Sequence, residues 1–222
     1  EIAKNHPVDL GVVADPKSTL TLLAKAIQAV QTDAQRLQSI ERKQTLVANK
    51  EQQLQQALSA DQAADETGQL HFSTFMKAFA EQLPSDPIVF DEALTSSPAM
   101  TRYLPPRKEG HYFVTRGGSL GVGIPGAIGL KLANPDKTVV GFTGDGGSMY
   151  TIQALWTAAR YNVDAKFVIC NNRSYKLLQL NIKQFWEETS IPAHDFPLSF
   201  DLSRPAIRFD EMARSMGVEA IR

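Results

Sequence analysis

The segment from Thr138 to Tyr175 constrains the fold more than any other part of the sequence, because it reads as two strands joined by a helix. Short β-branched runs predict strands over 138–143 and 166–170, and apolar residues at helical spacing predict a helix over about 149–161. A crossover of this length makes the strands parallel, so the turns that follow them emerge at the same edge of the sheet. Open α/β sheets bind ligands at that carboxyl-terminal edge.

The two turns carry groups that suit a metal ion and a phosphate. Gly144-Asp145-Gly146 offers a carboxylate between glycines that allow a tight turn and close ligand approach. Asn172 adds an amide oxygen, and the backbone of Arg173–Ser174 can add a carbonyl. Hard oxygen donors suit Mg²⁺, which binds one or two protein groups together with phosphate oxygens. The amides of Gly147 and Ser148 open the helix and favour the same phosphates. The sequence therefore predicts a Mg²⁺–diphosphate site.

G-D-G, followed by residues 147–170 and then N-N, resembles the thiamine diphosphate (ThDP) signature of the 2-oxo acid decarboxylase and acetohydroxyacid synthase superfamily. Within this superfamily, the segment SMYTIQALWTAARYNVDAKFVICNN is most similar to the benzoylformate decarboxylases. The resemblance implies a diphosphate-binding domain with a doubly wound, mainly parallel sheet flanked by helices. It also implies that Asp145 and Asn172 bind Mg²⁺ through their side chains and Ser174 through its carbonyl. A plain βαβ unit with a glycine turn and a polar loop is the alternative.

The resemblance also assigns the remaining contacts of the cofactor. The loop that follows a strand predicted at 88–90 lies over the diphosphate, and the segment before Gly121 passes under the thiamine. A backbone carbonyl near Gly118 would hold the aminopyrimidine, and Leu120 would act as a wedge that bends the two rings. The expected cofactor contacts are Leu94, Thr95, Gly118, Ser119, Leu120, Gly144, Asp145, Gly146, Gly147, Asn172, Ser174 and Tyr175, and Leu177 and Leu178 are expected to form part of the substrate wall.

Two of these segments have another interpretation. Gly121, Gly123 and Gly126 satisfy the dinucleotide fingerprint G-x-G-x-x-G of NAD(P)-binding Rossmann domains. Against it, no strand leads directly into Gly121, and Pro125 stands inside the supposed phosphate turn. These small residues can equally serve close helix packing. For the loop that carries Leu94 and Thr95, an ordinary polar turn between a strand and a helix is the alternative.

The whole chain is expected to divide into three segments. Residues 1–32, with a strand over 8–14 and a helix over about 18–30, resemble the last βα unit of a middle domain. Residues 33–68 are expected to form a half-buried linker helix, to about Asp61, and a loop. A coiled-coil helix is the alternative. Residues 69–222 are the expected diphosphate-binding domain, truncated at its C-terminus. Its further predicted elements are helices over 71–83, from about 126 to 133, from 174 onward and over 210–216, and a last strand over 218–221.

The resemblance implies a ThDP-dependent enzyme that decarboxylates a 2-oxo acid. Acetohydroxyacid-synthase-like carboligation and a non-catalytic ThDP-binding role are the alternatives. The family carries its catalytic glutamate and most acid/base residues on the pyrimidine-binding domain of a partner subunit. No catalytic residue is therefore expected here beyond the wedge Leu120, and we expect an inactive fragment of a homodimer or homotetramer. Lys176, Leu180 and Asn181 depart from benzoylformate decarboxylase and argue against an aryl substrate.

Composition excludes several other classes of protein. The formal net charge is −1 and no basic stripe is present, which argues against a nucleic-acid partner. The longest apolar runs have the length of strands, so no membrane span is expected. The single cysteine, Cys170, ends a predicted buried strand and is interpreted as a core residue rather than a nucleophile. No signal peptide is recognised, and a cytoplasmic location is the default expectation.

Overall fold

The computed structural model describes residues 5–65 and 70–222. The chain separates into two compact units, Glu1–Ala60 and Asp61–Arg222. The first unit contains α1 (Pro16–Val30) and most of α2 (Asp33–Asp65). Asp15 caps α1, because its carboxylate accepts a hydrogen bond from the Ser18 N–H at 2.8 Å, and Pro16 occupies the start of the helix.

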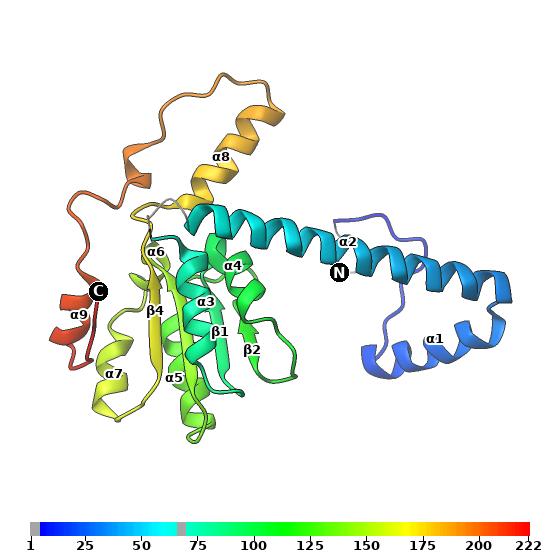
Figure 1. Ribbon diagram of the computed structural model, residues 1–222, viewed down its shortest axis with the longest axis horizontal. Helices are drawn as coiled ribbons and strands as arrows, with labels where there is room; N and C mark the ends of the chain where they lie inside the picture. Colours follow the sequence, from blue (N-terminus) through cyan, green and yellow to red (C-terminus); the bar gives the residue numbers. More distant parts are fainter. Residues whose placement is uncertain (1–4, 66–69) are drawn as a thin grey trace. The chain divides into compact units, whose positions relative to one another are not determined.

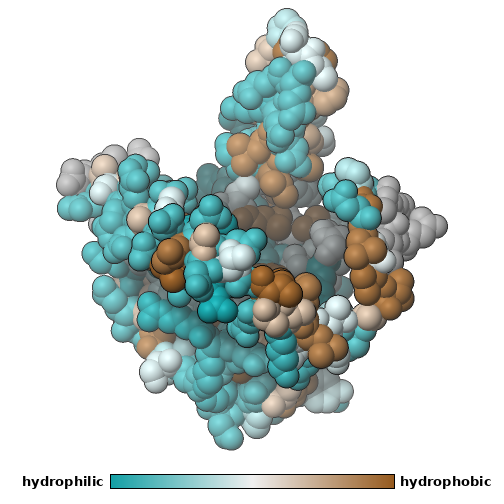
Figure 2. All heavy atoms as spheres, turned by 90° about the vertical axis from the view of Figure 1, so that its right-hand side faces the viewer, coloured by the Kyte–Doolittle hydropathy of each residue, from teal (hydrophilic) through white to brown (hydrophobic). Residues whose placement is uncertain are grey.

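The predicted apolar face of α1 is exposed to solvent. Leu20, Leu23 and Ile27 are 64%, 51% and 48% exposed, and no residue of the helix is buried. Figure 2 shows hydrophobic groups of the chain, in brown, exposed among hydrophilic ones. A single helix cannot bury its own apolar stripe, so α1 gains little stability from packing within its unit.

Two expectations for the N-terminal part are corrected. Residues 8–14 do not form a strand, because the chain is irregular there and no described residue pairs with it; a strand needs a partner for its backbone N–H and C=O groups. α2 continues to Asp65, so the loop predicted from Asp61 does not begin before residue 66. Residues 66–69, which include the predicted domain boundary at 68–69, lie outside the described residues.

Four parallel strands form the sheet of the second unit, in the spatial order β2-β1-β3-β4 (Figure 1). They are β1 (Ile88–Glu92), β2 (Tyr112–Val114), β3 (Val139–Gly144) and β4 (Lys166–Cys170). The two central strands, β1 and β3, are buried almost throughout, as expected for the middle of a parallel sheet. From β1 the chain builds to β2 on one side and to β3 and β4 on the other, so the topological switch point lies between β1 and β3.

Helices cover both faces of this sheet, which confirms the predicted doubly wound fold (Figure 1). One face carries α3 (Phe72–Gln82) and α4 (Ser97–Tyr103), and the other carries α5 (Gly123–Ala133), α7 (Ala154–Arg160) and α9 (Phe209–Ser215). The first pair packs around Met76, Met100 and Phe142. The second group packs around Ile124 and Leu155. No helix in 5–65 or 70–222 has the length and apolar character needed to cross a membrane.

The other helical elements of this unit follow the strands at the carboxyl-terminal edge of the sheet. η1 (Leu94–Ser96) follows β1, α6 (Asp145–Ser148) follows β3, and α8 (Lys176–Glu188) follows β4. Beyond α8, η2 (Leu198–Phe200) leads toward α9. Each parallel strand thus delivers a polar turn to one edge, as the sequence predicts for the strands before Asp145 and Asn172.

Three elements of the second unit differ from the prediction. The helix expected over 149–161 begins later and is shorter, because α7 covers only Ala154–Arg160 and turns follow the end of α6 at Ser148. Between them the backbone turns through i→i+3 bonds, such as Thr151 N–H to the Ser148 carbonyl at 3.1 Å. The sequence does not predict β2, a three-residue strand beside β1. The strand expected over 218–221 does not form.

Candidate functional site

Asp145 stands at the turn that follows β3. Gly144 pairs with Cys170 in the register of β3 and β4, so the turns after these strands leave the sheet as neighbours. Asp145 is 4% exposed and opens α6. Its Oδ1 accepts a hydrogen bond from the Gly146 N–H at 3.0 Å. Its buried Oδ2 has no hydrogen-bond partner among the described residues.

Burial dominates the electrostatics of this carboxylate. Desolvation raises the pKa of Asp145 above its usual value, and the nearby backbone N–H groups of Gly146, Arg173 and Ser174 act in the opposite direction. A buried carboxylate with an unpaired oxygen is costly unless a cation or a donor meets it. The Oδ2 position therefore fits a metal ion.

The other ligands of such an ion cannot come from a cluster of acidic side chains. Within the described ranges, no group of three or more His, Cys, Asp or Glu side chains could hold a metal. An ion at Asp145 would need oxygens from amides, carbonyls, phosphate or water, which is the donor set that Mg²⁺ accepts. The residues present thus fit Mg²⁺ better than a metal that prefers histidine or thiolate.

The loop after β4 holds the other predicted ligands. The Asn172 Oδ1 accepts the Ser174 N–H at 3.0 Å, which folds the loop as an Asx turn, with Arg173 in the left-handed region at φ 58°. The Ser174 carbonyl accepts the Lys176 N–H at 2.8 Å and keeps a second lone pair. Both predicted oxygens therefore already have one hydrogen bond and retain acceptor capacity. Their role as metal ligands stays a prediction.

Tyr175 packs directly on the turn that follows β3. A Cβ added to Gly146 would lie 2.4 Å from the Tyr175 Cε1, so the ring rests on the backbone of the turn. Only glycine allows this approach. The contact brings the two predicted halves of the site, Gly144–Gly147 and Asn172–Tyr175, together.

The loop between β2 and α5 reaches the same edge. Gly118 and Gly121 have φ values of 72° and 84°, which favour glycine. The Thr151 hydroxyl donates to the Gly121 carbonyl at 2.5 Å, and a Cβ added to Gly121 would lie 2.6 Å from the Tyr150 Cβ. Gly121, which directly follows the predicted contacts 118–120, is therefore held against the turn between α6 and α7.

Several predicted contacts are apolar side chains that remain exposed. η1, which carries Leu94 and Thr95, contacts α8, which carries Leu177 and Leu178. The exposed fractions are 37% for Leu94, 44% for Leu120, 40% for Leu177 and 45% for Leu178. Exposed leucines at the same edge of the sheet as a buried carboxylate are suited to a ligand that has both an apolar and an anionic part.

Glu92 is a site residue that the sequence analysis missed. It ends β1 and is 1% exposed. Its carboxylate accepts hydrogen bonds from the Gly121 and Gly123 N–H groups and, at 3.3 Å, from the Thr143 hydroxyl. The signal that could have found it is the one that found Asp145, a carboxylate directly after a buried strand.

The same bonds correct the dinucleotide interpretation of Gly121, Gly123 and Gly126. In that fingerprint the backbone approaches a pyrophosphate, whereas here the N–H groups of the first two glycines donate to Glu92. A Cβ added to Gly126 would lie 2.7 Å from the Phe90 ring. Close packing of the small residues is confirmed, and the dinucleotide interpretation is wrong.

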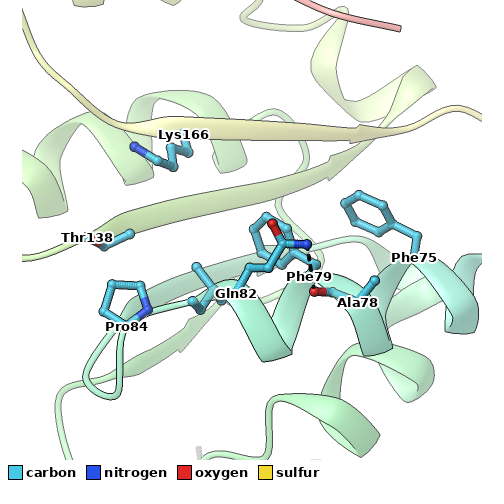
Figure 3. A pocket seen from close by; sticks show the side chains of 8 residues that line it. Phe75, Ala78, Phe79, Gln82, Pro84, Thr138 and Lys166 are labelled. Carbon is cyan, nitrogen blue, oxygen red and sulfur yellow. Dashed lines mark hydrogen bonds between the residues drawn. The ribbon is translucent and has the colours of Figure 1, made fainter.

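A cavity of about 380 Å³ lies at the opposite edge of the sheet. It is bounded by Phe75, Phe79 and neighbouring residues of α3 and by Thr138 and Lys166, where β3 and β4 begin (Figure 3). At about 3.3 Å per strand residue, the length of β3 separates it from Asp145 by roughly 20 Å. The cavity therefore takes no part in the predicted site.

Comparisons with known proteins agree on one family. Residues 95–222 match the family described as "Thiamine pyrophosphate enzyme, C-terminal TPP binding domain". The benzoylformate decarboxylase of Pseudomonas aeruginosa is 36% identical over 158 residues, which cover 71% of this chain and 28% of that protein. The large subunit of acetolactate synthase isozyme 1 of Escherichia coli is 35% identical over 102 residues, which cover 46% of this chain and 17% of that protein.

A solved structure gives the same result. The thiamine diphosphate-dependent 4-hydroxybenzoylformate decarboxylase of Rhodococcus jostii RHA1 superimposes with a TM-score of 0.58 at 31% identity. The match covers 68% of this chain and 27% of that one. The chain therefore spans less than a third of the length of each of these relatives.

Proposed function

Because the chain belongs to the thiamine pyrophosphate enzymes, through their C-terminal TPP-binding domain, we propose that it holds thiamine diphosphate through Mg²⁺ at the carboxyl-terminal edge of its sheet. One observation carries the proposal. Asp145 is buried, its Oδ2 has no partner among the described residues, and it lies beside the loop that follows β4. A diphosphate-bound cation would supply the missing partner.

The site residues take distinct roles in this proposal. Asp145 and Asn172 bind Mg²⁺ through their side chains and Ser174 binds it through its carbonyl. Gly146, Gly147 and Tyr175 cradle the diphosphate together with Leu94, Thr95 and Gly144, while Gly118, Ser119 and Leu120 hold the rings and Leu177 and Leu178 line the substrate side. When bound, thiamine diphosphate supplies the electron sink for cleavage next to a carbonyl, and the chain contributes its binding and orientation.

We further propose that the complete enzyme decarboxylates a 2-oxo acid. The similarity to a benzoylformate decarboxylase over 71% of the chain supports this reaction. The similarity to an acetolactate synthase subunit supports carboligation as the second candidate. Release of CO₂ from one substrate, without a product that joins two substrates, would distinguish decarboxylation from carboligation.

We also propose a domain arrangement for the chain. Residues 1–32 belong to a middle domain, 33–68 to a linker and 69–222 to the diphosphate-binding domain. A pyrimidine-binding domain of a partner subunit completes the site in a cytoplasmic homodimer or homotetramer. The chain alone then turns over no 2-oxo acid, even with ThDP and Mg²⁺.

Thermal melting tests the cofactor site. A ligand that binds only the native state at 100 times its Kd adds about 2.7 kcal/mol, which corresponds to roughly 5–10 °C for a chain of this size. We expect a rise of this order with ThDP and Mg²⁺, and none with ThDP and EDTA or with NAD. In Asp145→Ala the rise with ThDP and Mg²⁺ should disappear.

Asp136→Ala is the matched control, since Asp136 is exposed in the turn before β3, at the far edge of the sheet. This variant should keep the full response to ThDP and Mg²⁺. Stabilisation that persists in EDTA or in Asp145→Ala would contradict the proposed metal site. Stabilisation by NAD instead of ThDP would contradict the proposed function as a whole.

A further inference from the structure

We propose that Glu92 is a positioning residue of the cofactor site, whose carboxylate fixes the loop before α5 against the turn after β3. The inference rests on the proposed function and extends it to a residue outside the predicted metal and cofactor set. Glu92 does not face the ligand. It acts through the backbone of the segments that do.

The first step is the placement of Glu92 in the sheet. It is the last residue of β1 and pairs with Thr143 of β3 across the topological switch point. Ligands of open α/β sheets bind at this crevice. With 1% of its surface exposed, the carboxylate lies beneath the crevice rather than in it.

The second step is the number of segments that meet at this carboxylate. The Gly121 and Gly123 N–H groups donate to its two oxygens, which ties it to the loop that carries Gly118 and Leu120. The Thr143 hydroxyl donates to it from β3 at 3.3 Å. An added Cβ at Gly147 would lie 3.5 Å from the Glu92 Oε1, so the first turn of α6 rests on it as well.

The third step is chemical. Backbone N–H groups that are buried need acceptors, and a carboxylate offers acceptors only. Glutamine has the same length, but one of its two oxygens is replaced by an amino group that donates. In Glu92→Gln, one of the two glycine N–H groups therefore faces another donor and loses its bond.

The close approach of Gly123 to Glu92 requires glycine. An added Cβ at Gly123 would lie 2.7 Å from the Glu92 Oε2 and 2.9 Å from the Thr143 Cβ. Gly123 is the first residue of α5, and the helix can begin this close to the carboxylate only with glycine at that position. Through Gly121 and Gly123, Glu92 thus joins β1 to the loop before α5 and to the start of α5.

The test titrates ThDP in the presence of Mg²⁺ into the wild-type chain, Glu92→Gln and Asp61→Asn, well below their melting temperatures. Asp61 is the matched control, because it is a buried carboxylate of the same unit that binds Arg102 and Tyr103. Both variants should melt at lower temperature than the wild type. Only Glu92→Gln should weaken ThDP binding, with a Kd raised about tenfold or more.

A second readout reports on the loop itself. Hydrogen–deuterium exchange of peptides that cover 115–124 should become at least several-fold faster in Glu92→Gln and stay unchanged in Asp61→Asn. A loss of packing elsewhere would not move this segment selectively. If Glu92→Gln does not fold, Glu92→Asp replaces it, since its shorter carboxylate cannot reach both N–H groups, and a Kd raised about threefold or more is expected.

The outcomes separate this inference from the proposed function. Wild-type binding with an unchanged Kd in the Glu92 variant overturns the inference and leaves the proposed function standing. An equal loss of affinity in Asp61→Asn also overturns it, because the effect would then be general. Absence of ThDP binding by the wild-type chain overturns the proposed function and the inference together.

Discussion

At the residue scale, Asp145 combines burial with an unused acceptor. Its Oδ1 is occupied by the Gly146 N–H, and its Oδ2 has no partner in the part of the chain that the structure describes. Such a group destabilises the fold when no cation is bound and becomes favourable when one is. Asp145, the proposed metal ligand, should therefore destabilise the fold when no metal is bound.

This argument predicts the behaviour of Asp145→Asn without ligands. In EDTA and without cofactor, the neutral amide avoids the desolvation that raises the pKa of the wild-type carboxyl. We expect the variant to melt above the wild type by about 2–4 °C, which is roughly 1 kcal/mol for a chain of this size. A fluorescence melt at pH 7 measures the difference. A melting temperature below that of the wild type would mean that the Oδ2 environment supplies donors after all.

Local sequence was sufficient to predict Asp145 and Asn172 but not Glu92. The first two stand in short glycine and asparagine turns directly after strands. The partners of Glu92 are 29 and 31 residues away in the chain, at Gly121 and Gly123. Only the folded sheet brings them together, so a carboxylate at the end of β1 does not by itself indicate which backbone groups it binds.

At the element scale, α5 uses its glycines unequally. Gly126 faces β1, where an added Cβ would lie 2.7 Å from the Phe90 ring. Gly129, one turn later, has nothing within 4 Å of an added Cβ and is exposed. The same substitution should therefore have opposite effects at the two positions.

We predict that Gly126→Ala destabilises the fold by about 1–3 kcal/mol through overpacking. Gly129→Ala should stabilise it by about 0.5–1 kcal/mol, since alanine favours a helix interior. Urea unfolding of the two variants beside the wild type measures both values. Equal effects would show that α5 does not approach β1 as closely as described.

A second element-scale feature is the ion-pair cluster around Asp86, which joins the amino-terminal ends of the sheet. Lys108 and His111, which precede β2, approach its Oδ1 at 3.1 and 3.0 Å, and Lys137, which precedes β3, binds its Oδ2. These contacts lower the pKa of Asp86 to about 2, and the hydrogen bond from Lys137 has the largest effect. The group therefore stabilises the fold above its unfolded pKa of about 3.9.

Asp86→Asn should accordingly lower the urea midpoint at pH 7. The difference from the wild type should narrow as the pH falls from about 4 toward 2, because the wild-type carboxyl then becomes protonated in both states. Asp164→Asn is the control, since Asp164 is 80% exposed and lies 3.7 Å from Lys166, and such pairs contribute little. A pH-independent difference would rule out the ion pairs as its cause.

The strands that sequence reasoning got wrong share a physical cause. The apolar runs at 8–14 and 218–221 have strand composition, but strand formation depends on a neighbour that the local sequence does not specify. β2 is the converse case, because Tyr112–Val114 has strand-forming residue types but is too short to be predicted locally, and it becomes a strand beside Val89–Asp91. The apolar runs of β1, β3 and β4 needed no such help, and both ends of each strand were predicted within two residues.

At the scale of the whole molecule, one ion pair fixes where the second unit begins. Asp61 is 8% exposed and accepts hydrogen bonds from Arg102 at 2.8 and 2.9 Å and from the Tyr103 hydroxyl at 3.0 Å. The second unit begins at this residue, so the last residues of α2, 61–65, belong to it. The last turns of α2 are therefore part of the stability of the sheet domain.

Truncations test this boundary. Deleting residues 1–57 should change the unfolding free energy of the remaining chain little, because α1 buries no residue. Deleting residues 1–69 removes Asp61 and leaves Arg102 without its partner, which should cost about 1–3 kcal/mol more. Urea unfolding of both fragments provides the comparison. Equal stabilities would show that the Asp61 contacts contribute nothing.

Asp91 and Glu92 give β1 a further property, because the two neighbours serve opposite faces of the sheet. Asp91 accepts the Ser97 hydroxyl and the Ala93 N–H on the face of α3 and α4, while Glu92 serves the face of α5. Inserting or deleting a single codon within the strand would exchange these faces and misdirect both carboxylates at once. The length of β1 is therefore more tightly constrained than its composition, because it fixes which face of the sheet receives each carboxylate.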